Sequence, residues 1–195
     1  RTRDLTPSAS AADRQGRLDP AATLQGGGAG RFLDFITGEL RQSVEAQLPD
    51  GMRILRRTLI GHSFGGLFTV NAVLTQPHAF DDFIAADPSF WWDQRRLIQK
   101  AAADGLGDKA AAGPGRRLYL GFATKPRKDR TDSADRPAAG ARLSADPLVS
   151  DFIGKLQSQG MQVRRQDFPD EVHGTVMFPA LFDALKHFYT RELSQ

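Results

Sequence analysis

A serine between two glycines is the feature of this sequence that points most directly to chemistry. The segment Gly61-His62-Ser63-Phe64-Gly65 fits the pattern G-x-S-x-G, which places a nucleophilic serine on a sharp turn between a strand and a helix. Glycines are expected on both sides because a side chain there would collide with neighbouring backbone. The turn would present the Ser63 hydroxyl at the carboxyl end of a sheet, with the Phe64 N–H at the helix start directed toward a developing oxyanion. The alternative is a tightly packed turn in which Ser63 only caps the helix.

A serine hydroxyl needs a base within hydrogen-bond reach, and the sequence has four histidines. His173 is the candidate base, because it lies in the loop 170–175 between the last predicted strand and the last predicted helix. That loop is expected at the same sheet edge as Ser63, in the serine-then-histidine order of such sites. The alternative is a loop histidine that caps the helix. The other three histidines are interpreted as ordinary surface or boundary residues (His62, His78 and His187).

The acid that would orient the imidazole is not fixed by the sequence. Asp129 is one candidate, since it lies in the loop after the next-to-last strand, and Glu171, two residues before His173, is the other. Asp87 and Asp93, after an earlier strand, are alternatives. A serine–histidine pair without an acid, or with a water in its place, would also fit the pattern.

Two tryptophans follow the same earlier strand as those aspartates. Trp91 and Trp92 would lie at the carboxyl edge of the sheet and line a pocket for an acyl or aryl group. The alternative is packing in the core or in a lid. No H-x-H or H-E-x-x-H pattern and no cysteine is present, so no metal site is predicted.

Short apolar runs that alternate with longer helical patterns would position these residues. The predicted strands cover residues 57–60, 83–86, 118–122 and 161–168, and the predicted helices cover residues 31–47, 67–75, 93–104, 148–156 and 178–189. This alternation predicts an α/β fold, with a parallel sheet covered by helices on both faces. Residues 1–30 are expected to form an irregular lead-in, residues 31–195 the catalytic part of one domain, and residues 124–141 a long surface loop.

Composition narrows the function classes. A length of 195 residues with 40% hydrophobic and 25% charged residues is typical of one globular domain. The net charge of +3 is small and the arginine pairs are scattered, so no nucleic-acid partner is predicted. No apolar run is long enough to predict a membrane span. The sequence gives no indication of the oligomeric state.

Four segments carry a resemblance to a known family, namely Arg31–Phe35, Leu59–Phe68, Asp87–Asp93 and Glu171–Val176. Over about residues 30–190 the chain resembles the putative-esterase family of α/β-hydrolases, which includes siderophore trilactone esterases and esterase D-like enzymes. The resemblance implies the α/β-hydrolase fold and hydrolysis of a small-molecule ester. It implies an acyl-enzyme on Ser63, with His173 as base and no cofactor. Some members use a serine–histidine pair alone.

The family fold has more strands than the four expected here. The resemblance therefore implies that N-terminal strands are missing from this chain, together with the loop that donates the second oxyanion N–H. Two alternatives stay open on the same residues. One is an acyltransferase, which would need an alcohol acceptor in a site that excludes water. The other is an inactive scaffold.

Overall fold

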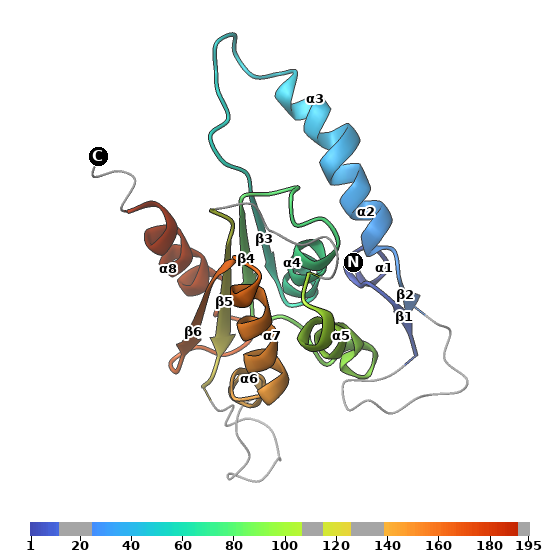
Figure 1. The fold of residues 1–195 in the computed structure, drawn as a ribbon, viewed down its shortest axis with the longest axis vertical. Helices are drawn as coiled ribbons and strands as arrows, with labels where there is room; N and C mark the ends of the chain where they lie inside the picture. Colours follow the sequence, from blue (N-terminus) through green and yellow to red (C-terminus); the bar gives the residue numbers. More distant parts are fainter. Residues whose placement is uncertain (12–24, 107–114, 126–138, 191–195) are drawn as a thin grey trace.

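A four-stranded parallel sheet forms the centre of the structure, a computed structural model that describes residues 1–11, 25–106, 115–125 and 139–190 (Figure 1). The strand order follows the sequence: β3 (Thr58–His62), β4 (Asp82–Ala86), β5 (Arg117–Ala123) and β6 (Gln162–Phe168). Neighbouring strands start level with one another, since Thr58 pairs with Asp82, and Asp82 pairs with Arg117. The loops that leave the carboxyl ends therefore meet at one edge of the sheet.

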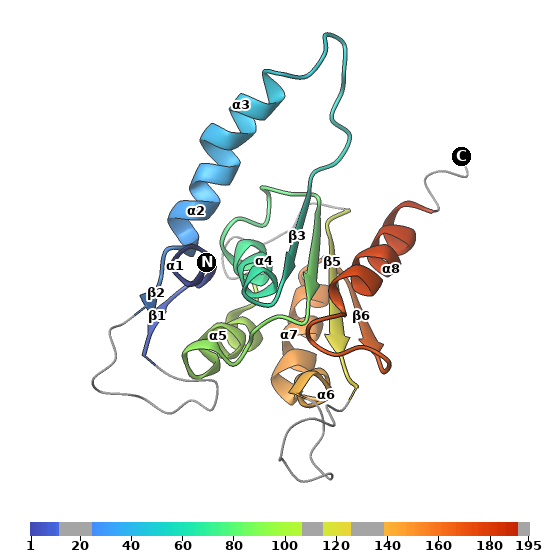
Figure 2. The same cartoon turned by 180° about the vertical axis from the view of Figure 1, so that it is seen from behind.

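Helices cover both faces of this sheet, as Figures 1 and 2 show from opposite sides. Three of them lie on one face: α4 (Phe64–Thr75), α5 (Arg96–Asp104) and α7 (Pro147–Ser158). α8 (Met177–Tyr189) lies on the other face. Alternate strand residues point to the two sides: Phe83 and Leu118 pack with the first group, and Ile84 and Tyr119 pack with α8. Burial on both faces explains why β4, at the sheet centre, is buried at all five positions.

The predicted fold class is confirmed, and the predicted strands agree with the observed ones to within two residues. Continuous apolar runs such as 83–86 made the buried strands recognisable. The segment before α5 differs from a regular helix, because Trp92–Arg95 forms a 3-10 turn (η2) in which three successive residues have positive φ angles (Asp93, Gln94 and Arg95). Most of the expected loop 124–141 lies outside the described residues, and α6 (Ala139–Ser144) begins at its end.

The N-terminal stretch contains more regular structure than the expected irregular lead-in. Its described part holds α1 (Thr2–Leu5) and a small antiparallel pair, β1 (Ala9–Ser10) with β2 (Gln25–Gly26). The buried Thr6 joins these pieces, because its hydroxyl donates to the Thr2 carbonyl and accepts from the Gly27 N–H. The division into a lead-in and a catalytic part stays a prediction.

A long helical rod follows, built from α2 (Ala29–Phe35), the π-helical turn η1 (Ile36–Leu40) and α3 (Arg41–Glu45). Its first turns pack on the body through the fully buried Ala29 and Leu33. Its far end extends away from the sheet (Figures 1 and 2), and there the apolar side chains of Leu40 and Val44 are exposed. Within the described ranges, no helix is both long enough and apolar enough to cross a bilayer.

Candidate active site

Ser63 occupies a strained turn between β3 and α4. Its φ of 61° and ψ of −118° lie outside the regions that residues with a side chain normally adopt. Two backbone hydrogen bonds to the end of β4 and the loop after it hold this conformation. The Ser63 N–H donates to the Ala86 carbonyl at 3.0 Å, and the Ser89 N–H donates to the Ser63 carbonyl at 3.1 Å. The end of β4 thus fixes the turn that carries the serine.

The glycines around Ser63 have different steric roles. A Cβ on Gly61 would lie 2.0 Å from the Gly65 carbonyl oxygen, so this position admits no side chain. At Gly65 the expected steric requirement is not found, because a Cβ there would meet nothing within 4 Å. The next residue is the tight one: a Cβ on Gly66 would lie 3.0 Å from the Ala86 oxygen and from the Pro88 Cα. The close approach of α4 to the end of β4 is therefore made at Gly66.

His173 joins Ser63 to a buried carboxylate. Its Nε2 lies 3.0 Å from Ser63 Oγ, and its Nδ1 lies 2.5 Å from Asp87 Oδ2. An ionised carboxylate can only accept a hydrogen bond, so Nδ1 carries the proton and Nε2 is left as the acceptor for the serine hydroxyl. The His173 side chain is 41% exposed, which leaves this histidine open to solvent on one side.

The carboxylate on His173 is Asp87, which the sequence offered only as an alternative. Asp87 directly follows β4 and is 6% exposed. Its N–H donates to the Gly121 carbonyl at 2.7 Å, and its Oδ1 accepts from the Ala123 N–H at 3.3 Å. These contacts to β5 aim the second oxygen, Oδ2, at the histidine.

The two acids preferred from the sequence do not fill this place among the described residues. Glu171 accepts a hydrogen bond from Thr175 Oγ1 at 2.5 Å, within its own loop, so its carboxylate closes that loop instead of contacting the imidazole. Asp129 lies outside the described residues. Asp93, the other alternative, has its Oδ2 4.0 Å from Arg96.

His62 corrects a second interpretation, since it is not an ordinary boundary histidine. Its Nε2 lies 2.7 Å from the His173 carbonyl oxygen, and the two rings are 4.6 Å apart between centroids. A carbonyl only accepts, so Nε2 carries the proton and donates. Burial and the nearby His173 lower the pKa of His62, which favours the neutral form of its ring. His78 and His187 are exposed, as expected.

The two tryptophans have different surroundings. Trp92 is 7% exposed, and its indole N–H donates to the Ser8 carbonyl at 2.9 Å, so it packs in the core and offers little area to a ligand. Trp91 is partly buried and lies 5.6 Å from the Phe64 ring, between centroids. Phe64 is the first residue of α4, and its N–H is one of the four that have no partner within a helix.

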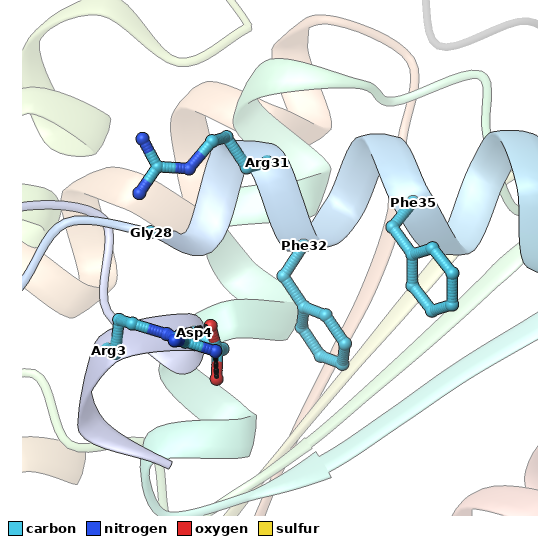
Figure 3. A pocket seen from close by; sticks show the side chains of 6 residues that line it. All are labelled: Arg3, Asp4, Gly28, Arg31, Phe32 and Phe35. Carbon is cyan, nitrogen blue, oxygen red and sulfur yellow. Dashed lines mark hydrogen bonds and ion pairs between the residues drawn. The ribbon is translucent and has the colours of Figure 1, made fainter.

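A separate recess of about 300 Å³ lies where α1 meets the start of α2 (Figure 3). It is lined by the Arg3–Asp4 ion pair, Gly28, Arg31, Phe32 and Phe35, and it includes neither Ser63 nor His173.

Among the residues that the structure describes, no group of three or more His, Cys, Asp or Glu side chains could hold a metal ion.

Residues 7–146 match the family described as Putative esterase. The chain belongs to this esterase family. The match covers the serine turn and Asp87. The resemblance drawn from the four sequence segments is therefore confirmed.

The chain is also similar to curated esterases and to solved structures of hydrolases. The chain is 33% identical over 164 residues to the siderophore enterobactin esterase of Emericella nidulans, covering 80% of this chain and 54% of that protein. It is similar to the siderophore hydrolase EstA from Aspergillus nidulans, with a TM-score of 0.72 and 29% identity over 100% of this chain and 67% of that one. An IroE-like serine hydrolase from Shewanella oneidensis gives a TM-score of 0.69 and 29% identity over 97% and 57%. The chain thus spans about half the length of the curated esterase, and the sheet with its helices has the α/β-hydrolase fold.

Proposed function

We propose that this chain carries the catalytic centre of a serine esterase. Ser63 is the nucleophile, His173 the general base, Asp87 the acid that orients it, and the Phe64 N–H an oxyanion donor. The observation that carries the proposal is the continuous chain from Asp87 Oδ2 through the His173 ring to Ser63 Oγ, with contacts of 2.5 and 3.0 Å. Nucleophile, base and orienting acid at these separations are the arrangement that acyl transfer requires.

The reaction follows from the proton positions. Ser63 Oγ attacks the ester carbonyl while its proton passes to His173 Nε2, and Asp87 stabilises the imidazolium that forms. The Phe64 N–H donates to the oxygen of the tetrahedral intermediate. His173 then gives its proton to the leaving alcohol. A water, deprotonated by the same Nε2, attacks the acyl-enzyme and releases the acid and free Ser63.

The substrate class is proposed from the relatives. Two curated relatives of this chain are named as siderophore esterases, for enterobactin in one case and for triacetylfusarinine C in the other. We infer that the full-length protein hydrolyses an ester bond of a siderophore or of a small acyl ester. Trp91, which is partly buried beside Phe64, is the candidate for lining the acyl side of the site.

The nucleophile is tested by removing it. In the full-length protein, Ser63→Ala should abolish hydrolysis of p-nitrophenyl acetate and labelling by a fluorophosphonate probe, because both need the Oγ. The matched control is Ser158→Ala, at the exposed end of α7, which should leave both unchanged. Unaltered turnover in Ser63→Ala would refute the assignment. A wild-type protein that the probe does not label would favour an inactive scaffold.

The substrate is tested separately. The wild-type protein is given enterobactin and triacetylfusarinine C, and ring-opened products are measured by mass spectrometry. Cleavage of either, lost in Ser63→Ala, supports the siderophore class. Turnover of p-nitrophenyl acetate with neither siderophore cleaved would restrict the proposal to small acyl esters. Acyl transfer to added glycerol in preference to water would identify an acyltransferase.

A further inference from the structure

A second buried hydroxyl lies against the nucleophile. Ser89 Oγ is 3.3 Å from Ser63 Oγ, and Ser89 is 3% exposed. Ser89 follows Asp87 by two residues in the loop after β4, so one short segment brings both a carboxylate to His173 and a hydroxyl to Ser63. Burying a hydroxyl costs free energy unless it is hydrogen-bonded. We therefore interpret this contact as a hydrogen bond between the two serines.

The direction of this hydrogen bond follows from the rest of the site. Asp87 accepts from His173 Nδ1, so Nε2 has no proton and must accept one from a donor. The donor is the Ser63 hydroxyl, whose single proton is then committed to His173. Between the two serines only one proton is left, that of Ser89. Ser89 therefore donates to Ser63 Oγ.

We infer that Ser89 is a further catalytic residue, whose hydroxyl donates to the reacting oxygen of Ser63; this inference rests on the proposed function. The donated hydrogen bond holds Ser63 Oγ in the position that faces Nε2. It also stabilises negative charge on this oxygen, both as its proton leaves for His173 and when Oγ is expelled from the acyl-enzyme. Ser89 keeps its own proton throughout, so the proton balance of the reaction is unchanged.

The side chain and the backbone of Ser89 make different contacts, so the role of its hydroxyl can be tested apart from its role in the fold. The Ser89 backbone N–H already bonds the Ser63 carbonyl at 3.1 Å, and the Ser63 N–H is held by Ala86. These two bonds fix the strained turn and do not involve the Ser89 side chain. Removing the hydroxyl should therefore leave the turn in place and change only the environment of Ser63 Oγ.

The test compares Ser89→Ala and Ser89→Cys with the wild type and with the Ser158→Ala control, all as full-length proteins. Active sites are titrated with a fluorophosphonate, so that kcat refers to folded, labelled protein. With a p-nitrophenyl ester, Ser89→Ala should lower kcat roughly tenfold, as expected for loss of one hydrogen bond to an oxygen that gains charge. KM should stay within about twofold, because the interaction is made to the enzyme's own nucleophile.

Ser89→Cys sharpens the result, because a thiol is somewhat larger than a hydroxyl and is still a donor, although a weaker one. Its kcat should lie between those of the wild type and Ser89→Ala. The inference is overturned if kcat per titrated site in Ser89→Ala stays within about twofold of the wild type, or if Ser89→Cys is as impaired as Ser89→Ala. Labelling of wild-type Ser63 is read in the same experiment. If that labelling fails, the proposed function fails; if it succeeds and Ser89→Ala is neutral, only the role of Ser89 is lost.

Discussion

Two buried aspartates stand at the two ends of β4, and their surroundings differ. Asp82 begins the strand, is fully buried, and accepts hydrogen bonds from three side chains that carry two positive charges (Arg56, Arg117 and Tyr189). Asp87 follows the strand and is nearly as buried. Its carboxylate meets the imidazole of His173 and the Ala123 N–H, a neutral donor, at a longer 3.3 Å.

The difference shows what each end is built for. Burial alone would raise the pKa of Asp82, but hydrogen bonds from Arg117, Arg56 and Tyr189 outweigh it and lower that pKa to about 2. Arginine is permanently charged, so this pairing is present wherever Asp82 is ionised. The partner of Asp87 is an imidazole, which gains a positive charge in the reaction as it takes a proton from Ser63 or from water. The start of β4 carries an ion cluster around Asp82. At its end, Asp87 pairs with a histidine that gains its positive charge during the reaction.

The largest effect should come from Asp87→Asn. An amide can donate to His173 Nδ1, which moves the ring proton to Nε2 and removes the acceptor for Ser63 Oγ. We expect kcat to fall roughly 10³- to 10⁴-fold, with the free energy of unfolding changed by only about 1 kcal/mol. Steady-state kinetics and urea unfolding measure the two quantities.

The matched control for this variant is Glu171→Gln, at the acid that the sequence favoured. Its carboxylate bonds Thr175, so kcat should stay within about twofold of the wild type. Near wild-type turnover in Asp87→Asn would reduce the site to a serine–histidine pair. A large loss in Glu171→Gln instead would move the orienting role to that residue.

Asp82→Asn should show the opposite result, with a lower free energy of unfolding and an unchanged kcat. It leaves the partly buried Arg56 and Arg117 without their buried counter-charge, and breaking such a pair costs about 3 kcal/mol of unfolding free energy. The kcat per titrated site should not change, because the cluster lies at the other edge of the sheet. The effect should also depend on pH. The folded-state pKa of about 2 lies below the usual value of 3.8, so the stabilisation is complete above pH 4 and is lost as the pH falls toward 2.

That pH dependence is measured by urea unfolding between pH 6 and pH 2. Wild type should lose about 2 kcal/mol more than Asp82→Asn over this range, because the variant has no carboxylate to titrate. Asp151→Asn, on the exposed surface of α7, is the control and should follow the wild type. Equal pH slopes in wild type and Asp82→Asn would contradict the assignment of this cluster as a stabilising one.

The contrast also explains what the sequence could predict. The strands were found because buried runs such as 83–86 are apolar throughout, and Ser63 because its turn needs Gly61. His173 followed from the rule that loops after parallel strands meet at one edge. The same rule admitted Asp87, Asp93, Asp129 and Glu171, with Asp129 and Glu171 preferred, because it does not predict the direction of a side chain. That direction is set by the contacts of Asp87 to Gly121 and Ala123, which come from a strand that is distant in the sequence.

The smallest expected effect on kcat concerns the hydrogen bond by which His62 positions His173 at the carboxyl edge of the sheet. His62 donates through Nε2 to the His173 carbonyl at 2.7 Å, and its ring lies beside the catalytic ring. His62→Phe keeps an aromatic ring and loses the donor, so kcat should fall about fivefold, the worth of one neutral hydrogen bond. His62→Gln keeps an N–H donor and should restore most of that loss.

These two variants separate positioning from packing. If the hydrogen bond places His173, activity follows the donor, and His62→Gln exceeds His62→Phe in kcat at equal KM. If only the ring contact matters, the order reverses. Burial and the nearby His173 lower the pKa of His62 and so favour its neutral ring, and the comparison therefore reports on the geometry of the His173 loop.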